Sequence, residues 1–556
     1  MFETPPLLIL AATVAALGVL VPRLFERFRI NRAVERGLGQ ARIASDLDLS
    51  RVAAYHEAGD AHANSDTVED ATWSDLNFDA VFRAVDQTAS QIGRQYLYDL
   101  LRRPQFALDP LEHLEAAIRR FSDTPTDSAR AREILRPLDD PRAGYFTDLL
   151  YGELPGRPTL WWVFPVLTAT ACACLALIFV WPKAAVVWLV VCIANIAIQL
   201  IWRPRLRRLI IAFQSIPTFV GAAERLSGLS PIGIECEHAT LIKDTPKLAS
   251  LRRSTKWLLF EPGAANELAS SIYEYINILF LLDVNAFVFC ITRVQTARPV
   301  LRRVFAAIGR IDTAQSIAQW RHSLPHWTTP DFSAVGKTLR TTEVFHPLLT
   351  VPVANSLSVG GVSVLITGSN MAGKTTFMRT LGVNAILAQT LHTVCAHSWV
   401  APVLHVRSSI GRTDSLLDGK SHYLAEVESV RSLLYAKRPD RQHLFLLDEM
   451  FRGTNTAERV AAAYAVLAYL TQGIDIVLVA THDLELVELL GDAYETYHFR
   501  ERVEDGTLFF DYRLRAGASS TRNAIALLQA KQYPEEIIAN AMAVLNRAQV
   551  PAAPQA

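Results

Sequence analysis

The sequence lacks the features that mark several common protein classes. Its six cysteines show no paired spacing of the kind that cysteine-based zinc sites need, so we expect buried, reduced thiols. Lys and Arg total 55, as do Asp and Glu, and a net charge of zero gives no overall sign of nucleic-acid binding, although a local basic patch remains compatible with it. Only 20% of the residues are charged and half are hydrophobic, which is apolar for a soluble protein.

A glycine-rich stretch, ITGSNMAGKTT, organises the chain because it fits the phosphate-loop pattern G-x-x-x-x-G-K-[ST]. The apolar residues 362–366 before it predict a buried strand, and Phe377, Leu381 and Ala385 recur after it at helical spacing. A strand, this loop and a helix predict a site for a nucleoside triphosphate and Mg²⁺. Backbone N–H groups of the loop would hold the phosphates. The expected binding residues are Gly368, Ser369, Asn370, Met371, Ala372, Gly373, Lys374, Thr375 and Thr376. Among them, Lys374 would bridge the phosphates and Thr375 would ligate Mg²⁺.

Two later apolar runs end in residues that suit this site. The run 443–449 ends in Asp448, a candidate Mg²⁺ ligand, and Glu449, a candidate general base for the attacking water. The run 474–481 ends at His482, which is placed to sense the γ-phosphate if its strand lies in the same sheet. Ser421 precedes an expected helix, where a cap and an anion contact are both compatible with the sequence.

Long uncharged runs predict three transmembrane helices. The first is Pro5–Val21, which lacks the preceding basic residues of a signal peptide. Thr159–Trp181 and Ala184–Trp202 form an expected hairpin with tryptophans at its ends. Arginines follow the first and third runs, and this predicts a cytoplasmic location for the segments beyond them: Arg23, Arg27, Arg29, Arg32 and Arg36, then Arg203, Arg205, Arg207 and Arg208.

A fourth apolar run, 276–292, carries Asp283 and Asn285 at its centre, and a carboxylate there is costly in lipid. We therefore expect one long helix buried in protein. Residues 73–104 predict two amphipathic helices around 90–93, and 37–70 is polar without a clear period.

The segments GSNMAGKTT, DSLLDGKSHYLAE, LLDEMFRGTNTAER and VATHDLEL together resemble the ATPase domain of the MutS family of DNA mismatch repair proteins. His346-Pro347 resembles a motif that precedes the phosphate loop in this family. The likeness as a whole covers most of residues 73–130 and 205–545, and its helical motifs are less specific than its ATPase motifs. The resemblance implies that ATP and Mg²⁺ are cofactors and that the chain forms a homodimer through its ATPase domains.

The resemblance also implies roles for individual residues. Ser421 would reach the nucleotide of the partner subunit. With the resemblance, we prefer this role to that of a simple helix cap. Lys374, Glu449 and His482 would complete the catalytic set. The loop linking the two sites across the dimer would contain Arg452, Gly453, Thr454 and Thr456.

Departures from the family pattern limit what the resemblance implies. No mismatch-reading domain fits before residue 73, and the one Phe-x-Glu motif, 499–501, lies after the ATPase strands, so we treat it as chance. The DNA clamp is short or missing. Ala372 and Phe451 replace usual glycines, and Glu458-Arg459 replaces a usual Asp-Gly. ATP hydrolysis is compatible with these changes, whereas mismatch recognition does not follow from them.

The predicted architecture combines an α/β P-loop ATPase domain (ABC/MutS type) with an all-α helical core and lever domain and three transmembrane helices. The expected parts are an anchor (1–30), a linker (31–70), a first helical part (71–150), a transmembrane hairpin (151–208), a second helical part (209–335), the ATPase domain (336–548) and a disordered tail (549–556).

The expected function is a dimeric ATPase in a bacterial-type inner membrane, with its ATPase domain in the cytoplasm, acting on double-stranded DNA or DNA-bound partners. One alternative is a nucleotide-gated membrane scaffold that binds protein partners instead of DNA. A transporter ATPase is the weaker alternative, because three spans are few and Asp-Gly-Lys-Ser stands where that class has Leu-Ser-Gly-Gly.

Overall fold

The computed structural model describes residues 48–59, 66–229, 235–258, 267–368, 372–411, 422–504, 507–518, 525, 528–529 and 531–548. The expected N-terminal span and anchor, part of the expected linker and the expected disordered tail lie outside these residues. The chain divides into two compact units. The first comprises residues 1–64, 87–99 and 116–318, and the second comprises 65–86, 100–115 and 319–556. The division falls within the helices α5 (Gln91–Arg102), α6 (Asp109–Asp123) and α14 (Leu282–Ser323).

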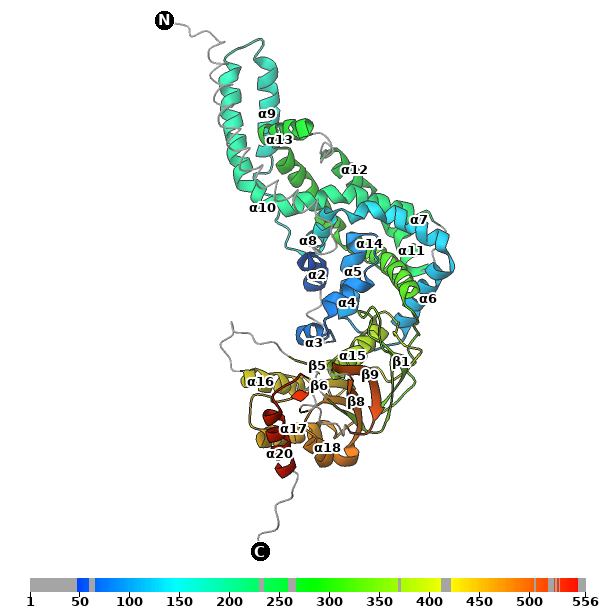
Figure 1. Ribbon diagram of the computed structural model, residues 1–556. Helices are drawn as coiled ribbons and strands as arrows, with labels where there is room; N and C mark the ends of the chain where they lie inside the picture. The colour runs from blue at the N-terminus through cyan, green and yellow to red at the C-terminus, as the bar shows by residue number, and fades with distance from the viewer. Residues whose placement is uncertain are drawn as a thin grey trace. The chain divides into compact units, whose positions relative to one another are not determined.

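In the part that the structure describes, the first unit is built of helices (Figure 1). Besides parts of α5, α6 and α14, they are α2 (Leu49–Ala58), α7 (Pro125–Leu135), η2 (Arg136–Asp139), η3 (Pro141–Tyr145), α8 (Phe146–Tyr151), α9 (Val163–Leu177), α10 (Ala184–Ser227), α11 (Glu235–Asp244), η4 (Thr245–Leu248), α12 (Ala249–Leu258) and α13 (Glu267–Phe280). Buried aromatic rings join them: Phe146 lies 4.5 Å from Phe219 and 6.2 Å from Phe305, between ring centroids. These rings form the core of the unit, since all three are fully buried.

Two regions are more helical than the sequence predicts. The span 31–70 is predicted as a linker, yet α2 lies within it; Asp48 caps its first turn, and Tyr55 packs 5.0 Å from Phe305. Residues 70–102 form three helices instead of two: α3 (Asp70–Asp75), α4 (Phe78–Val85) and α5. The break before α5 is at residues 86–90, where the carboxylate of the buried Asp312 accepts hydrogen bonds from the Ala89 N–H and the Ser90 hydroxyl. Long-range hydrogen bonding of this kind leaves no local signal.

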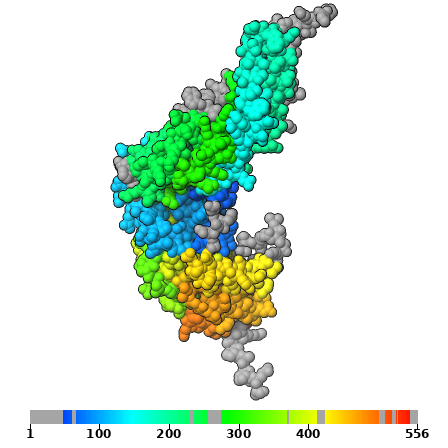
Figure 2. Space-filling view, turned by 180° about the vertical axis from the view of Figure 1, so that it is seen from behind, coloured from blue at the N-terminus to red at the C-terminus, as the bar shows by residue number. Residues whose placement is uncertain are grey.

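The hairpin predicted from the uncharged runs forms, with α9 and α10 side by side (Figure 1). Among the described residues, α10 is the single helix that is long and apolar enough to cross a membrane by length and composition, and 33% of its apolar window is buried. The apolar helix α9 has 15 residues, which is shorter than a typical span. Figure 2 shows the cyan hairpin extending from the green helices of its unit, and both of its helices contact α13 near that end. Helix α10 also continues through Pro204 and Pro217 to Ser227, without a break after the arginines.

The apolar run 276–292 is two helices, so the expectation of one long helix is wrong. Helices α13 and α14 meet at Leu281, whose φ is +52°, and the axes of 274–280 and 282–323 differ by 68°. Side chains fill the bend: Asn195 of α10 donates to the Leu279 carbonyl at 2.6 Å, and Asn277 accepts from the Asp283 N–H at 2.9 Å. Burial of Asp283 in protein is confirmed, with 6% of the residue exposed.

Among its described residues, the second unit contains two sheets (Figure 1). The larger has the order β5-β6-β7-β3-β8-β9, parallel except for β9, and the smaller, antiparallel sheet has the order β2-β1-β4. The strands are β1 (Thr338–Val344), β2 (Asn355–Gly360), β3 (Ser363–Thr367), β4 (Ser398–Val400), β5 (His405–Ser409), β6 (His443–Asp448), β7 (Ile476–Ala480), β8 (Tyr494–Glu504) and β9 (Thr507–Ala516). The helices are α3, α4, α15 (Lys374–Thr390), α16 (His422–Tyr435), α17 (Thr456–Leu470), α18 (Glu485–Leu490), η6 (Gly491–Ala493) and α20 (Glu535–Ala548). The predicted α/β ATPase-type fold is therefore present.

Helix α3 is bound to the edge strand of the larger sheet, although more than 300 residues separate them in sequence. The buried Asp75 carboxylate accepts hydrogen bonds from the Ser408 hydroxyl at 2.8 Å and the Ile410 N–H at 2.9 Å. The Asp75 carbonyl accepts from Arg379 of α15 at 2.8 Å. Residues 65–86 thus belong structurally to the unit that holds the phosphate loop.

Candidate functional site

The phosphate loop begins where β3 ends, in the middle of the larger sheet. Strand β3 is buried along its whole length and pairs with β7 and β8. Gly368 has φ +128° and lies against β8, so a Cβ there would meet the Phe499 carbonyl oxygen at 2.8 Å. Gly373 has φ +109° at the start of α15. Both positions need glycine, as the loop pattern predicts; Ser369, Asn370 and Met371 lie outside the described residues.

The position of Phe499 bears on the Phe-x-Glu motif. Phe499 is 2% exposed in β8, and its ring packs against Phe377 of α15 with centroids 5.9 Å apart. The phenylalanine therefore lies in the core behind the phosphate loop. A buried ring cannot act as a wedge between bases, in agreement with the interpretation of this motif as chance.

Lys374 is the first residue of α15 and is fully buried. Its Nζ donates to the Gly368 carbonyl and lies 3.5 Å from Glu449 Oε1. Burial lowers the pKa of Lys374 below its ordinary value, while Glu449 and Asp448 oppose this change. A lysine held this way across the loop is placed to meet phosphate oxygens. Ala372 is buried beside it, whereas Thr376 is exposed.

Thr375 and Asp448 come together as a pair of oxygen ligands. The Thr375 hydroxyl donates to Asp448 Oδ2 at 2.6 Å, so α15 and the end of β6 meet at this point. Asp448 Oδ1 is buried and has no hydrogen-bond partner in the part of the chain that the structure describes. Burial is the main cause that raises the pKa of Asp448. A hydroxyl and a buried carboxylate with an unpaired oxygen fit a hard cation such as Mg²⁺.

Glu449 lies among three basic side chains. Besides Lys374, its carboxylate is 2.5 Å from Arg452 Nη2 and 3.4 Å from His482 Nδ1. Glu449 has φ +43° and its N–H bonds to the Ala480 carbonyl of β7 at 2.9 Å, so the turn after β6 aims this side chain across the strand ends. The sequence-predicted Lys374, Thr375, Asp448, Glu449 and His482 therefore form one cluster.

Sequence reasoning missed two contacts around this cluster. Arg459 of α17 binds Asp483 through both carboxylate oxygens, at 2.6 and 2.9 Å, and thereby holds the turn that carries His482. A Cβ at Gly453 would lie 2.6 Å from the Cβ of Tyr423 in α16, so the 452–456 loop touches the start of that helix. Neither pair has a spacing signal in the sequence.

The remaining predicted residues are placed as follows. Thr454 donates to Glu458 at 2.8 Å, and Thr456 is the first residue of α17. Ser421 lies outside the described residues, immediately before α16. His346 is buried, which lowers its pKa to about 4, and its Nδ1 accepts from the Leu348 N–H at 3.2 Å. The imidazole of His346 is therefore neutral at pH 7 and serves the turn before β2.

The sheet and this cluster define an α/β domain of the phosphate-loop nucleotide-binding class. The family model for MutS domain V matches residues 364–549, which run from β3 past α20. The DNA mismatch repair protein MutS of one Thermus thermophilus strain is 32% identical over 260 residues, covering 46% of this chain and 31% of that protein. MutS of Bacillus subtilis 168 is 28% identical over 287 residues, covering 50% and 33%. MutS of Thermus aquaticus is 36% identical over 205 residues, covering 36% and 25%.

Residues 364–549 match MutS domain V, and the curated MutS relatives match up to half of this chain, which confirms the resemblance predicted from its motifs. Domain V is the ATPase domain of MutS-family proteins, so the second unit carries the family's ATPase domain. The matched region spans about a third or less of the length of these curated relatives.

Proposed function

We propose that the chain is a membrane-anchored, dimeric MutS-like ATPase that hydrolyses ATP with Mg²⁺. The observation that carries the proposal is the convergence of Lys374, Thr375, Asp448 and Glu449 at the carboxyl ends of β3 and β6. Thr375 and Asp448 would hold Mg²⁺, because Asp448 Oδ1 is buried and unpaired there. When bound, the ion supplies charge that stabilises the phosphate oxygens in the transition state.

The proposed role of Glu449 follows from its neighbours. Lys374 leaves Glu449 and the Gly368 carbonyl to bind the terminal phosphates, and this frees one carboxylate oxygen. A water oxygen then attacks the γ-phosphorus, its proton passes to Glu449, and the bond to the bridging oxygen breaks with ADP as the leaving group. His482, 3.4 Å from the same carboxylate, would contact the γ-phosphate oxygens and report whether they are present.

The partner in this proposal is a second copy of the chain, with Ser421 reaching the nucleotide of the other subunit. Support comes from the loop 452–456, which matches the loop that links the two ATPase sites across the dimer in this family. Arg452 at its start pairs with Glu449 while 41% of its side chain is exposed, and Gly453 touches Tyr423, two residues after Ser421. A movement of the start of α16 on dimerisation would therefore reach the Arg452–Glu449 pair.

The exposed surface of the α9–α10 hairpin supports the membrane part of the proposal. Large apolar side chains lie on its outside, with relative exposures of 90% for Phe179, 83% for Val180 and 60% for Val190. Water contact with this much apolar surface is unfavourable, and a bilayer removes it. The arginines after Trp202 and Lys183 at the hairpin tip give the orientation, with the ATPase unit in the cytoplasm of a bacterial-type inner membrane.

The modification rates of two native cysteines in liposomes test whether the α9–α10 hairpin inserts into the membrane. Cys172 on α9 and Cys236 on α11 are both exposed free thiols in the structure. We expect a water-soluble maleimide to modify Cys236 at least ~10-fold faster than Cys172, because thiols in hydrocarbon stay protonated and out of reach of the reagent. After unfolding in denaturant the two rates should become similar, which controls for intrinsic reactivity. Equal rates in intact liposomes would contradict membrane insertion of α9.

We propose that this ATPase acts on double-stranded DNA, as the names of the relatives suggest. We expect duplex affinity to fall steeply with salt, since phosphate contacts release counterions. Fluorescence anisotropy with matched and mismatched duplexes, measured on the full-length protein with ATP, ADP and no nucleotide, would show this. The zero net charge favours instead a scaffold for protein partners. Absence of binding at low salt in every nucleotide state would favour that scaffold.

A further inference from the structure

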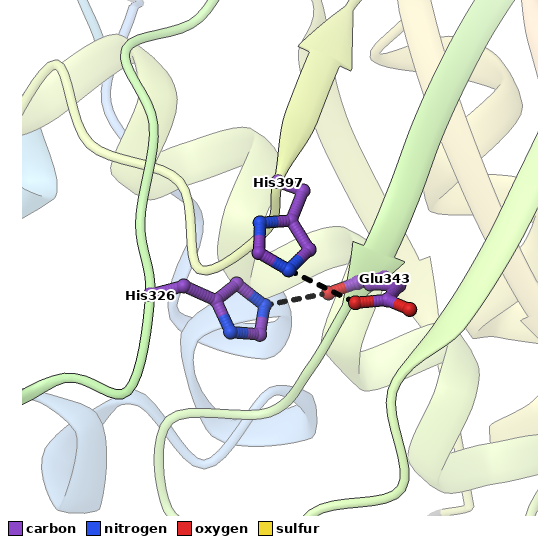
Figure 3. A group of neighbouring side chains, drawn as sticks. All are labelled: His326, Glu343 and His397. Carbon is purple, nitrogen blue, oxygen red and sulfur yellow. Dashed lines mark hydrogen bonds and ion pairs between the residues drawn. The ribbon is translucent and has the colours of Figure 1, made fainter.

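Two histidines and a glutamate meet beside the smaller sheet of the second unit, away from the phosphate loop residues described above. Figure 3 shows His326, Glu343 and His397 with their side chains directed toward one another. His326 lies three residues after the end of α14, Glu343 lies in β1, and His397 directly precedes β4. One ligand atom of each lies within 4.8 Å of the other two. None of these residues has a role in the ATPase proposed above.

The backbone holds Glu343 in an unusual conformation. The β1–β2 register shifts between Thr341 and Val344, so Glu343 lies in a bulge, and its φ is +50°. Its N–H, which cannot join the regular ladder there, donates to the Ser356 hydroxyl at 3.0 Å. Bulges and left-handed backbone at residues other than glycine aim side chains that a regular strand would point elsewhere. Here the bulge turns both the carboxylate and the carbonyl of Glu343 toward the histidines (Figure 3).

Four atoms that can bind a metal ion lie close together here. His397 Nε2 lies 2.9 Å from Glu343 Oε2, and His326 Nε2 lies 3.1 Å from the Glu343 backbone oxygen. The two imidazole rings are nearly parallel, with centroids 4.0 Å apart and 8° between their planes. Phe345 packs edge-on against His326 at 4.8 Å and fixes one side of the group. The set is two imidazole nitrogens, one carboxylate oxygen and one carbonyl oxygen.

We propose that His326, Glu343 and His397 form a site for Zn²⁺ or a divalent ion of similar size and preference. Zinc bonds of about 2.0–2.2 Å to nitrogen and oxygen place neighbouring ligand atoms of a tetrahedron about 3.3–3.6 Å apart. The observed 2.9 and 3.1 Å separations need only a small expansion. The rings must also turn out of their parallel stack, which the 54% exposure of the His397 side chain permits. Imidazole nitrogen disfavours Mg²⁺ and Ca²⁺, and the lack of thiolate disfavours Cu(I).

The bound ion would fasten three segments together. His397 already donates its N–H to the Thr342 carbonyl at 2.9 Å, and Thr328 bridges to Val394. Zinc would add bonds between the segment that follows α14, the bulge of β1 and the start of β4. The site therefore acts as a clip that ties the chain leaving α14 to the small sheet, and zinc occupancy would control how firmly that segment is held.

Zinc titration of the full-length, nucleotide-free protein against a chromophoric chelator tests the site, with excess Mg²⁺ present to compete at Asp448. We expect one Zn²⁺ per chain, and a loss of affinity of at least ~10-fold in each of the variants His326→Ala, His397→Ala and Glu343→Gln, since each loses a ligand. The control is His322→Ala, an exposed histidine in the last turn of α14 and four residues before His326, which should keep full affinity.

A second readout separates ligation from loss of fold. Co²⁺ in place of zinc should give the visible absorption of a four-coordinate site in the wild type and the control. The three ligand variants should lose this band while retaining ATP binding, which reports an intact second unit. Absence of saturable zinc binding in the wild type would overturn the proposal. So would unchanged affinity in the ligand variants, or an equal loss in His322→Ala.

Discussion

Glu449→Gln is expected to bind ATP normally and to lose nearly all hydrolysis. The substitution keeps the size of the side chain and removes its ability to accept a proton from water. General-base removal typically costs ~10²–10⁴-fold in rate. Lys374 and Thr375, which bind phosphate and Mg²⁺ in the proposal, remain in place, and the amide oxygen of the variant side chain can still accept a hydrogen bond from Arg452. Fluorescent-nucleotide titration would measure binding, and single-turnover phosphate release would measure the chemical step.

The matched control is Glu488→Gln. Glu488 is an exposed carboxylate in α18 of the same unit, so its substitution makes the same change in charge without touching the site. Its turnover should stay within about twofold of the wild type, because surface substitutions away from specific contacts are usually small in effect. Intact ATP binding with unchanged hydrolysis in Glu449→Gln would remove Glu449 from the role of base and point to a water held by other groups.

The meeting of the candidate site residues was predictable because parallel strands place their ends together. Local sequence identifies β3, β6 and β7 as short buried runs, and the residues after each run are polar. Once the three strands share a sheet, Lys374, Asp448 and His482 must lie near one another. The inference also requires the three strands to be close in the sheet, which local sequence does not establish; here β6, β7 and β3 are consecutive. The direct bond from Thr375 to Asp448 therefore agrees with the pattern.

Contacts set by tertiary structure were not predictable. Arg452 is three residues from Glu449, but its approach to the carboxylate depends on positive φ values of +43° at Glu449 and +63° at Phe451. The break between α13 and α14 is at Leu281, a residue type that gives no turn signal. Conversely, α10 runs through Pro204 although proline removes a helix hydrogen bond, so packing of this helix outweighs the local preference.

The largest effect on stability that we expect comes from removing one partner of a buried ion pair. Arg321, in the last turn of α14, and Glu115 of α6 form a two-bond ion pair in the second unit, with Nη–Oε distances of 2.7 and 3.2 Å. Their side chains are 2% and 7% exposed. Arg321 also donates to the Thr393 hydroxyl at 2.9 Å and lies over the Trp327 ring at 4.1 Å. Arg321→Met would remove both hydrogen bonds of the ion pair from the buried Glu115 carboxylate, which also lies 3.3 Å from His392 Nδ1.

We expect Arg321→Met to lower the unfolding free energy of the second unit by ~3–5 kcal/mol, the usual cost of removing one partner of a buried pair. Hydrogen exchange of the β6 and β7 amides is the measurement, because a two-unit chain does not unfold in a single step. Their protection should fall by roughly 10²- to 4 × 10³-fold, at ~1.4 kcal/mol per factor of ten.

A second substitution distinguishes the unpaired charge from the loss of arginine packing. Glu115→Leu in the Arg321→Met background removes the buried carboxylate, and we expect it to restore at least ~2 kcal/mol, since apolar replacements of buried pairs are often neutral. Arg515→Met, which breaks the half-exposed Arg515–Asp511 pair at 2.7 Å in β9, should change protection by less than ~1 kcal/mol. Arg321 also donates to the His392 carbonyl at 2.9 Å. If the double variant were as unstable as Arg321→Met, the stacking on Trp327 and the bonds to the Thr393 hydroxyl and the His392 carbonyl would be the dominant contribution of Arg321, and its charge would be secondary.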